Sequence, residues 1–198
     1  IFSIEIPVTV LEIMPWNGNG TEESPYLIKT AEDLENLGTK VNSGHMFTGV
    51  YFKMAADIDM SDFPDRLPIG SSSSRQFDGI FDGDGYSIYN LVSKRGGLFG
   101  YVCKYAVIKN VIIASGEIGS SNLSFMGAVA NWSNGADFIN CKNAATVYGS
   151  GYSGGIVGTV RDGGESVISG CVNTGNVYGR DTAVGGIVGH LDTSRQST

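Results

Sequence analysis

Short runs of Val, Ile and Phe, each bounded by Gly, Asn or Ser, recur through the last two thirds of this 198-residue chain. Such runs are typical of short β-strands separated by sharp bends. From Gly96 onward no stretch has a convincing helical period. The hydrophobic pattern therefore predicts an all-β structure for this part of the chain.

A tetrad of the form Gly-apolar-apolar-Gly returns at intervals of about 30 residues. Its copies begin at Gly97, Gly127, Gly155 and Gly186. The second copy closes on Ala130, so we expect its bend to have a different shape. About three short strands per repeat, stacked turn upon turn, predict a single-stranded parallel β-helix in which each coil buries its apolar side chains against the next.

A second motif, apolar-x-Asn/Gly-apolar, marks a bend. It aligns Asn90, Asn110, Asn140 and Gly170. Asn and Gly enter the left-handed backbone region most readily. We therefore expect these four residues to form one column in which every coil turns the same corner, with Asn amides able to hydrogen-bond along the stack.

Two cysteines, Cys141 and Cys171, follow this bend in successive coils. Side chains of a parallel ladder usually point in the same direction. A pair of buried free thiols is therefore favoured over a disulfide, which the spacing of adjacent strands would also permit.

The first third of the chain has a different pattern. Thr30 and Asp33 have the spacing of a capping box, and apolar residues follow at helical intervals until Gly44, which would end the helix. We predict an N-terminal extension or strand over 1–13, a cap with one short helix over 14–45, and the β-helix over 46–198. The cap would cover the open end of the first coil, and we expect the repeat array to continue in a longer parent protein.

The ordered set of motifs resembles the GLUG-repeat proteins. The resemblance rests on the tetrads and on a series of earlier segments: Trp16–Thr21, Pro25–Ile28, Phe52–Met60, Pro68–Gly70, Phe77–Gly79 and Phe81–Gly83. It implies a right-handed β-helix in secreted or cell-surface bacterial proteins, including haemagglutinin-like adhesins and the non-catalytic regions of immunoglobulin A proteases. It implies no catalytic residues.

The charge balance limits the kinds of partner that the chain is expected to bind. Thirteen Lys and Arg stand against 20 Asp and Glu, which gives a net charge of −7 and disfavours nucleic acid. No apolar run is long enough for a membrane span, so we expect no membrane insertion by this segment. We expect a monomer.

The acidic residues suggest two alternative roles, catalysis on a polysaccharide and binding of a calcium ion. Acids on neighbouring coils, among Asp57, Asp59, Asp62, Asp78, Asp82 and Asp84, would suit a polysaccharide lyase or hydrolase. The Asp-Gly pairs among them are also ordinary turn chemistry, and no catalytic site is favoured. Asp82 and Asp84 are candidates for a structural calcium ion, and no other cofactor is expected.

Aromatic residues are the candidates for ligand binding. Alternation places Tyr148 and Tyr178 outward on one face, one coil apart, and Trp132 is expected in a loop. The sequence thus predicts a non-catalytic adhesin or rigid spacer, with a host glycan or glycoprotein as its partner. The alternatives are an ancillary region of a surface protease of the immunoglobulin A protease type and a polysaccharide-acting enzyme.

Overall fold

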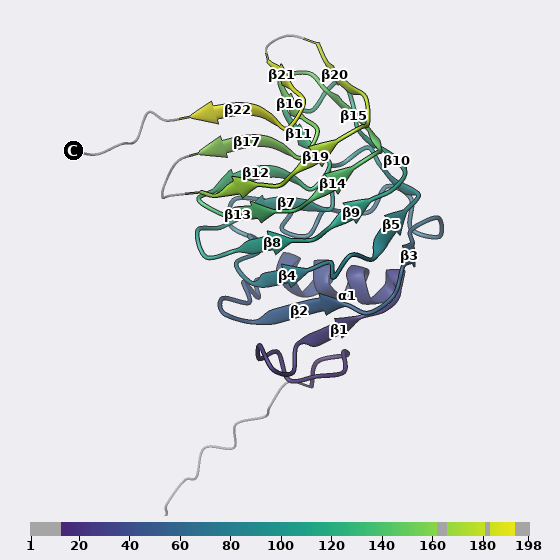
Figure 1. Cartoon of the computed structure of the whole chain (residues 1–198), viewed down its shortest axis with the longest axis vertical. Helices are drawn as coiled ribbons and strands as arrows, with labels where there is room; N and C mark the ends of the chain where they lie inside the picture. Colours follow the sequence, from purple (N-terminus) through teal and green to yellow (C-terminus); the bar gives the residue numbers. More distant parts are fainter. Residues whose placement is uncertain (1–12, 162–165, 181–182, 193–198) are drawn as a thin grey trace, which may run out of the picture.

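The computed structural model describes residues 13–161, 166–180 and 183–192. These residues form a parallel β-helix of about six turns with a single short helix near the N-terminus (Figure 1). The parallel β-helix predicted from the repeats is confirmed. The strand expected before residue 13 lies outside the described residues. No helix among the described residues is long and apolar enough to cross a membrane.

The strands stack into five parallel sheets within the described residues. Sheet 1 contains β1 (Tyr26–Ile28), β2 (Tyr51–Met54), β4 (Ile80–Asp82), β8 (Val107–Lys109), β13 (Asp137–Ile139) and β18 (Ile168–Ser169). Sheet 2 contains β3 (Ile58–Asp59), β5 (Ser87–Tyr89), β9 (Ile112–Ile113), β14 (Lys142–Asn143) and β19 (Val172–Asn173). Sheet 3 contains β6 (Leu91–Ser93), β10 (Gly116–Gly119), β15 (Thr146–Gly149) and β20 (Val177–Gly179).

The last two sheets lie on either side of the Gly-rich tetrads. Sheet 4 contains β11 (Phe125–Gly127), β16 (Tyr152–Gly154) and β21 (Val184–Gly185). Sheet 5 contains β7 (Phe99–Val102), β12 (Ala130–Asn134), β17 (Val157–Arg161) and β22 (Val188–Asp192). Figure 1 shows the strands of sheet 5 stacked one above the other toward the C-terminal end of the solenoid.

The core runs along the axis as ladders of apolar side chains. In sheet 1 the ladder contains, coil by coil, Phe52, Phe81, Ile108, Phe138 and Ile168. The first four are almost completely buried. Because each coil presents its apolar side chain to the next, the hydrophobic effect stabilises the contact between coils more than any single coil.

The cap covers the first coils. Its helix, α1 (Ala31–Asn42), begins at the capping box of Thr30 and Asp33 and buries one apolar face on the solenoid. Gly44 follows the helix with φ of 116°. Trp16, which is only 5% exposed, packs against Tyr26 and Phe52 and donates its indole N–H to the Asp33 carbonyl. The predicted helix and its signals are therefore confirmed.

The predicted bend column needs one correction. Asn110, Asn140 and Gly170 each follow a strand of sheet 1 and have φ between 54° and 65°. Asn90 has φ of 55°, but it follows β5 of sheet 2, and its N–H donates to the Ser115 hydroxyl of the next coil. The single column was wrong for Asn90, which turns a different corner. The sequence already indicates this difference, because Asn90 is 20 residues from Asn110, whereas Asn110, Asn140 and Gly170 follow one another at intervals of 30 residues.

The corner asparagines also bond differently from the expected amide stack. Asn110 donates its side-chain amide to the Asp82 carboxylate, at 2.8 Å, and Asn90 donates to the Asp59 carboxylate, at 2.9 Å. The amide pair that does join two coils is Asn143 and Asn173, at 2.9 Å. Carboxylates thus replace amides as partners where the coil below carries Asp.

The tetrad alignment also shifts by one residue in the second coil. Ala130 pairs with Phe99 on one side and with Val157 on the other. The residue equivalent to Gly100 and Gly158 is therefore Asn131, and the tetrad of this coil is 128–131. The expectation that Ala130 closes this bend was wrong. The chain carries an Asn side chain at a place where neighbouring coils have none.

The cysteines Cys141 and Cys171 are free thiols on successive coils. The Cys141 thiol donates to the Ile108 carbonyl at 3.5 Å, and the Cys171 thiol donates to the Phe138 carbonyl at 3.5 Å. The neighbouring Cys141 thiol lowers the pKa of Cys171. The neighbouring Cys171 thiol, together with burial, raises the pKa of Cys141.

We expect Asn140→Ala to lower the free energy of unfolding by about 1 kcal/mol, because alanine has the Cβ that is unfavourable at a left-handed position but lacks the polar side chain with which asparagine offsets that cost. Asn140→Gly is the matched control and should stay close to the wild type, since Gly170 occupies this place in the next coil. Urea denaturation of both variants provides the measurement. Equal stability of the two variants would show that the corner does not require a left-handed conformation.

Candidate functional site

A row of half-buried aromatic rings runs along sheet 5. Tyr101 on β7 and Trp132 on β12 occupy equivalent positions of successive coils. Their ring centroids are 6.0 Å apart and the ring planes are inclined by 31°. The two rings therefore form a broad and nearly continuous apolar surface on the outside of the solenoid.

Sheet 4 extends this surface from the other side of the tetrads. Phe125 on β11 meets Trp132 edge to face, with centroids 5.0 Å apart, and is 5.8 Å from Tyr152 on β16. Tyr152 in turn stacks on His190 of β22 at 4.1 Å. The tight turn between sheets 4 and 5 brings these rings together, because each strand of sheet 4 lies beside the strand of sheet 5 that follows it in the chain.

A small groove of about 190 Å³ opens beside the first three rings. Tyr101, Trp132 and Phe125 line its apolar side. Four polar residues also line it, Ser71, Arg95, Ser124 and Asn131. An aromatic platform with a few polar groups around it is the usual composition of a site for a small ligand. We call this feature the aromatic groove.

Asn131 connects the groove to the preceding coil. Its side-chain oxygen accepts a hydrogen bond from the Gly97 N–H at 3.0 Å. The close approach depends on a glycine at position 96, because a Cβ there would lie 2.3 Å from the Asn131 amide nitrogen. The asparagine introduced by the shifted tetrad therefore fixes one wall of the groove.

An arginine lies over the ring of Trp132. The Arg161 guanidinium lies 5.0 Å from the centre of the Trp132 ring, and it forms an ion pair with Asp192 at 3.4 Å. A cation over an indole face stabilises both groups by about 0.5–1 kcal/mol at an exposed site. This contact holds the Trp132 ring in place as a platform.

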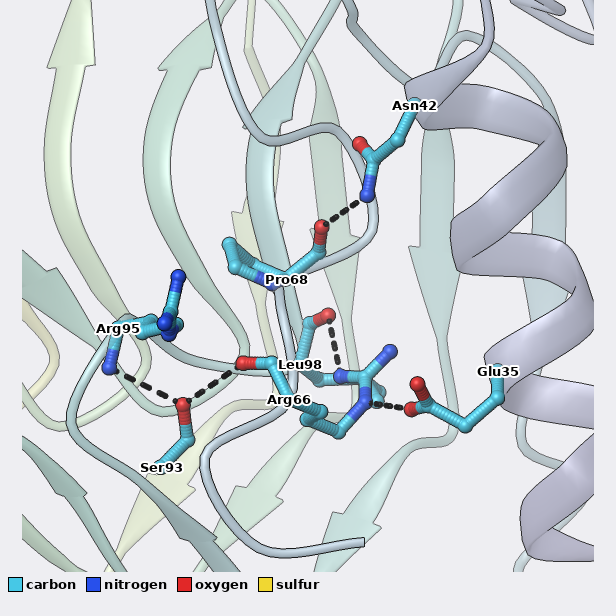
Figure 2. Close-up of polar contacts among 7 residues, drawn as sticks. All are labelled: Glu35, Asn42, Arg66, Pro68, Ser93, Arg95 and Leu98. Atoms are coloured by element: carbon cyan, nitrogen blue, oxygen red, sulfur yellow. Dashed lines mark hydrogen bonds and ion pairs between the residues drawn. The ribbon is translucent and has the colours of Figure 1, made fainter.

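The cap helix is hydrogen-bonded to another chain segment that lines the groove. Asn42 at the end of α1 donates to the Pro68 carbonyl at 3.1 Å (Figure 2). Asn42 also accepts from the Ser71 N–H at 2.7 Å. Pro68 and Ser71 both line the aromatic groove. The helix thus fixes the chain segment that faces the aromatic rings.

A buried arginine completes this support. The Arg66 side chain is 1% exposed, pairs with Glu35 of the cap helix and donates to the Leu98 carbonyl at 3.3 Å (Figure 2). The Arg66 carbonyl accepts from the Ser93 hydroxyl, which accepts from the Arg95 N–H, each at 3.1 Å. A chain of hydrogen bonds therefore runs from the cap helix to the backbone of Arg95 at the groove.

The structure separates the three aromatic residues that the sequence singled out. Trp132 lies within strand β12, so the expectation of a loop was wrong. Tyr148 and Tyr178 stack on each other on sheet 3, with centroids 5.1 Å apart and planes within 13°. Tyr178 is 51% exposed. Neither tyrosine lines the aromatic groove, so only Trp132 of the three belongs to it.

The two calcium candidates, Asp82 and Asp84, both form ion pairs. Asp82 pairs with Lys109 at 3.3 Å, and Asp84 pairs with Lys53 at 3.0 Å. Burial raises the pKa of Asp82, but hydrogen bonds from Asn110, the Asp84 N–H and Lys109 outweigh burial and lower it overall. A calcium ion at this place would have to displace two lysine ammonium groups from its ligands.

Sequence reasoning missed Tyr101, Phe125 and Arg95. The available signal was the register: with the tetrad of the second coil moved by one residue, Tyr101 and Trp132 occupy equivalent positions 31 residues apart. Phe125 and Tyr152 form a second equivalent pair. Arg95 carried no signal, because only the three-dimensional path of its loop brings it to the rings.

Comparisons with known proteins find two curated proteins with a segment similar to this chain. No protein-family model matches it, so the GLUG resemblance rests on the motifs alone. The chain is 33% identical over 162 residues to "Halomucin" of Haloquadratum walsbyi, a match that covers 73% of this chain and 2% of that protein. It is 32% identical over 111 residues to a "Putative Gly-rich membrane protein" of Evansella cellulosilytica, covering 51% of this chain and 12% of that protein.

One solved structure is similar over most of the chain. It is a "putative immunoglobulin A1 protease" from Bacteroides ovatus, with a TM-score of 0.62 and 27% identity, covering 89% of this chain and 65% of that one. The chain therefore spans a small part of the curated relatives and about two thirds of the solved one. The similarity supports a β-solenoid module of the type found in larger proteins with surface-type names.

Proposed function

We propose that this chain is a non-catalytic, extracellular β-solenoid module that acts as a cell-surface adhesin and binds a glycan or glycoprotein in the aromatic groove. The observation that carries the proposal is the convergence of Tyr101, Trp132 and Phe125 with polar side chains around one hollow. Aromatic faces bind the apolar faces of sugar rings, while the surrounding polar groups bind the hydroxyls.

The architecture suits this role. Ladders between coils form a rigid rod, so a groove on its side is presented at a fixed height and orientation. The hydrogen bonds from the cap helix and the Arg161 contact hold both walls before a ligand arrives, which reduces the entropy lost on binding. The names of the relatives, halomucin and a Gly-rich membrane protein, support a surface location.

A second candidate function is a spacer within a surface protease of the immunoglobulin A protease type. The solved relative named as such a protease favours it, because its solenoid aligns with 89% of this chain. In that role the module holds other domains away from the cell envelope. The two functions differ in one observable property, which is saturable binding of a glycan by the isolated module.

Binding of the purified chain to an array of host and microbial glycans tests the proposal. We expect saturable binding that Trp132→Ala weakens at least tenfold, about 1.4 kcal/mol, because the substitution removes half of the paired ring surface. Tyr178→Ala is the matched control, since it removes an exposed ring that lies outside the groove. Absence of binding would favour the spacer, and equal loss in both variants would move the site away from the groove.

A further inference from the structure

The aromatic groove carries a positive charge in a chain that is strongly acidic. The whole protein has 20 Asp and Glu against 13 Lys and Arg. Among the described residues that line the groove, Arg95 is charged and none is acidic. A groove of this kind attracts anions, although the net charge of the chain repels them at long range.

The Arg95 guanidinium is also available. Its side chain is exposed, and among the described residues no hydrogen bond or ion pair occupies it. Figure 2 shows Arg95 beside Ser93, whose hydroxyl accepts a hydrogen bond from the Arg95 backbone N–H. The arginine therefore combines an anchored backbone with an unoccupied charged end, which contrasts with Arg161, already paired with Asp192.

We propose that the aromatic groove recognises an acidic saccharide, a sugar whose carboxylate pairs with Arg95 while its ring lies against Tyr101 and Trp132. This inference rests on the proposed function and adds the class of the ligand. A planar guanidinium matches a carboxylate with two parallel hydrogen bonds. The Asn131 amide and the Ser124 hydroxyl are placed to bind the ring hydroxyls.

Two pairs of probes distinguish the contribution of the ligand's charge to binding from that of its sugar rings. The first pair is an oligogalacturonate and its methyl ester, and the second is sialyllactose and lactose. The methyl ester differs from the oligogalacturonate only in its masked carboxylates. Lactose differs from sialyllactose in lacking the whole acidic sugar residue. We expect at least one acidic probe to bind about tenfold more tightly than its uncharged partner, with an affinity that falls as salt is raised.

The matched variants are Arg95→Gln and Lys94→Gln, assayed on the whole chain by calorimetric titration. Both remove one positive charge from the same loop, but only Arg95 lines the groove. Arg95→Gln should remove the preference for the acidic probe, and Lys94→Gln should retain most of it. Because both side chains are exposed, both variants should fold, which circular dichroism verifies.

The results separate the two proposals. Equal binding of the acidic and uncharged probes, or an acid preference that survives Arg95→Gln, would overturn the acidic ligand and leave the glycan-binding function standing. Binding that responds equally to Arg95→Gln and Lys94→Gln would also overturn it, because the charge would then act at long range. Failure of all four probes, with binding of uncharged glycans on the array, would overturn only the acidic ligand.

Discussion

Glu35→Gln is expected to lower the free energy of unfolding by about 3 kcal/mol. The Arg66 side chain is 1% exposed, whereas that of Glu35 is 28% exposed. Removing the carboxylate therefore leaves a charged guanidinium in the interior without its counter-ion, which is the most costly way to break such a pair. Chemical denaturation of the variant and the wild type measures the difference.

The control for Glu35→Gln is a double-mutant cycle with Arg66→Met. Methionine retains much of the apolar volume and removes the buried charge, so the double variant should be more stable than Glu35→Gln alone. A Glu35→Gln variant within about 0.5 kcal/mol of the wild type would contradict this account of the cap.

Phe99→Ala is expected to cost about 4 kcal/mol of unfolding free energy. Phe99 begins strand β7, is fully buried, and packs against Phe77 and Phe81 with ring centroids 5.1 and 5.4 Å away. Truncation removes the transfer free energy of the ring and leaves a cavity that stacked coils cannot close. Since a domain is stable by about 5–15 kcal/mol, thermal and urea unfolding will register the loss clearly.

Phe99→Leu separates volume from aromaticity at this position. Leucine fills more of the site than alanine, so its cost should be less than half that of Phe99→Ala. Similar losses for the two variants would indicate that the ring contacts, and not the filled volume, stabilise this part of the core.

The fold was largely predictable from the sequence because its signals are local and repeated. Thr30 and Asp33 define the start of the helix within one turn, and the left-handed bend at Asn110 and Asn140 requires only two or three residues. In a solenoid each coil contacts its neighbours, so a local motif that recurs also predicts the contact between coils.

The site was less predictable because it depends on register. A shift of one residue at the second tetrad moves Asn131 to the bend and makes Trp132 equivalent to Tyr101. The spacing of Gly residues alone did not reveal this shift, since Ala128 occupies the place of a Gly. The role of the buried Arg66 could not be predicted from the sequence either, because its partner Glu35 lies 31 positions away in the cap helix.

The most direct measurement of the groove as a binding site is the fluorescence of Trp132 during titration with the acidic probe, oligogalacturonate or sialyllactose, that binds more tightly. The chain has two tryptophans, and Trp16 is buried in the cap, so Trp16→Phe leaves Trp132 as the single reporter. The account predicts a saturable change in emission, with the same midpoint as the heat of binding. Heat of binding without any change in Trp132 emission would contradict it, because the ligand would then bind elsewhere on the solenoid.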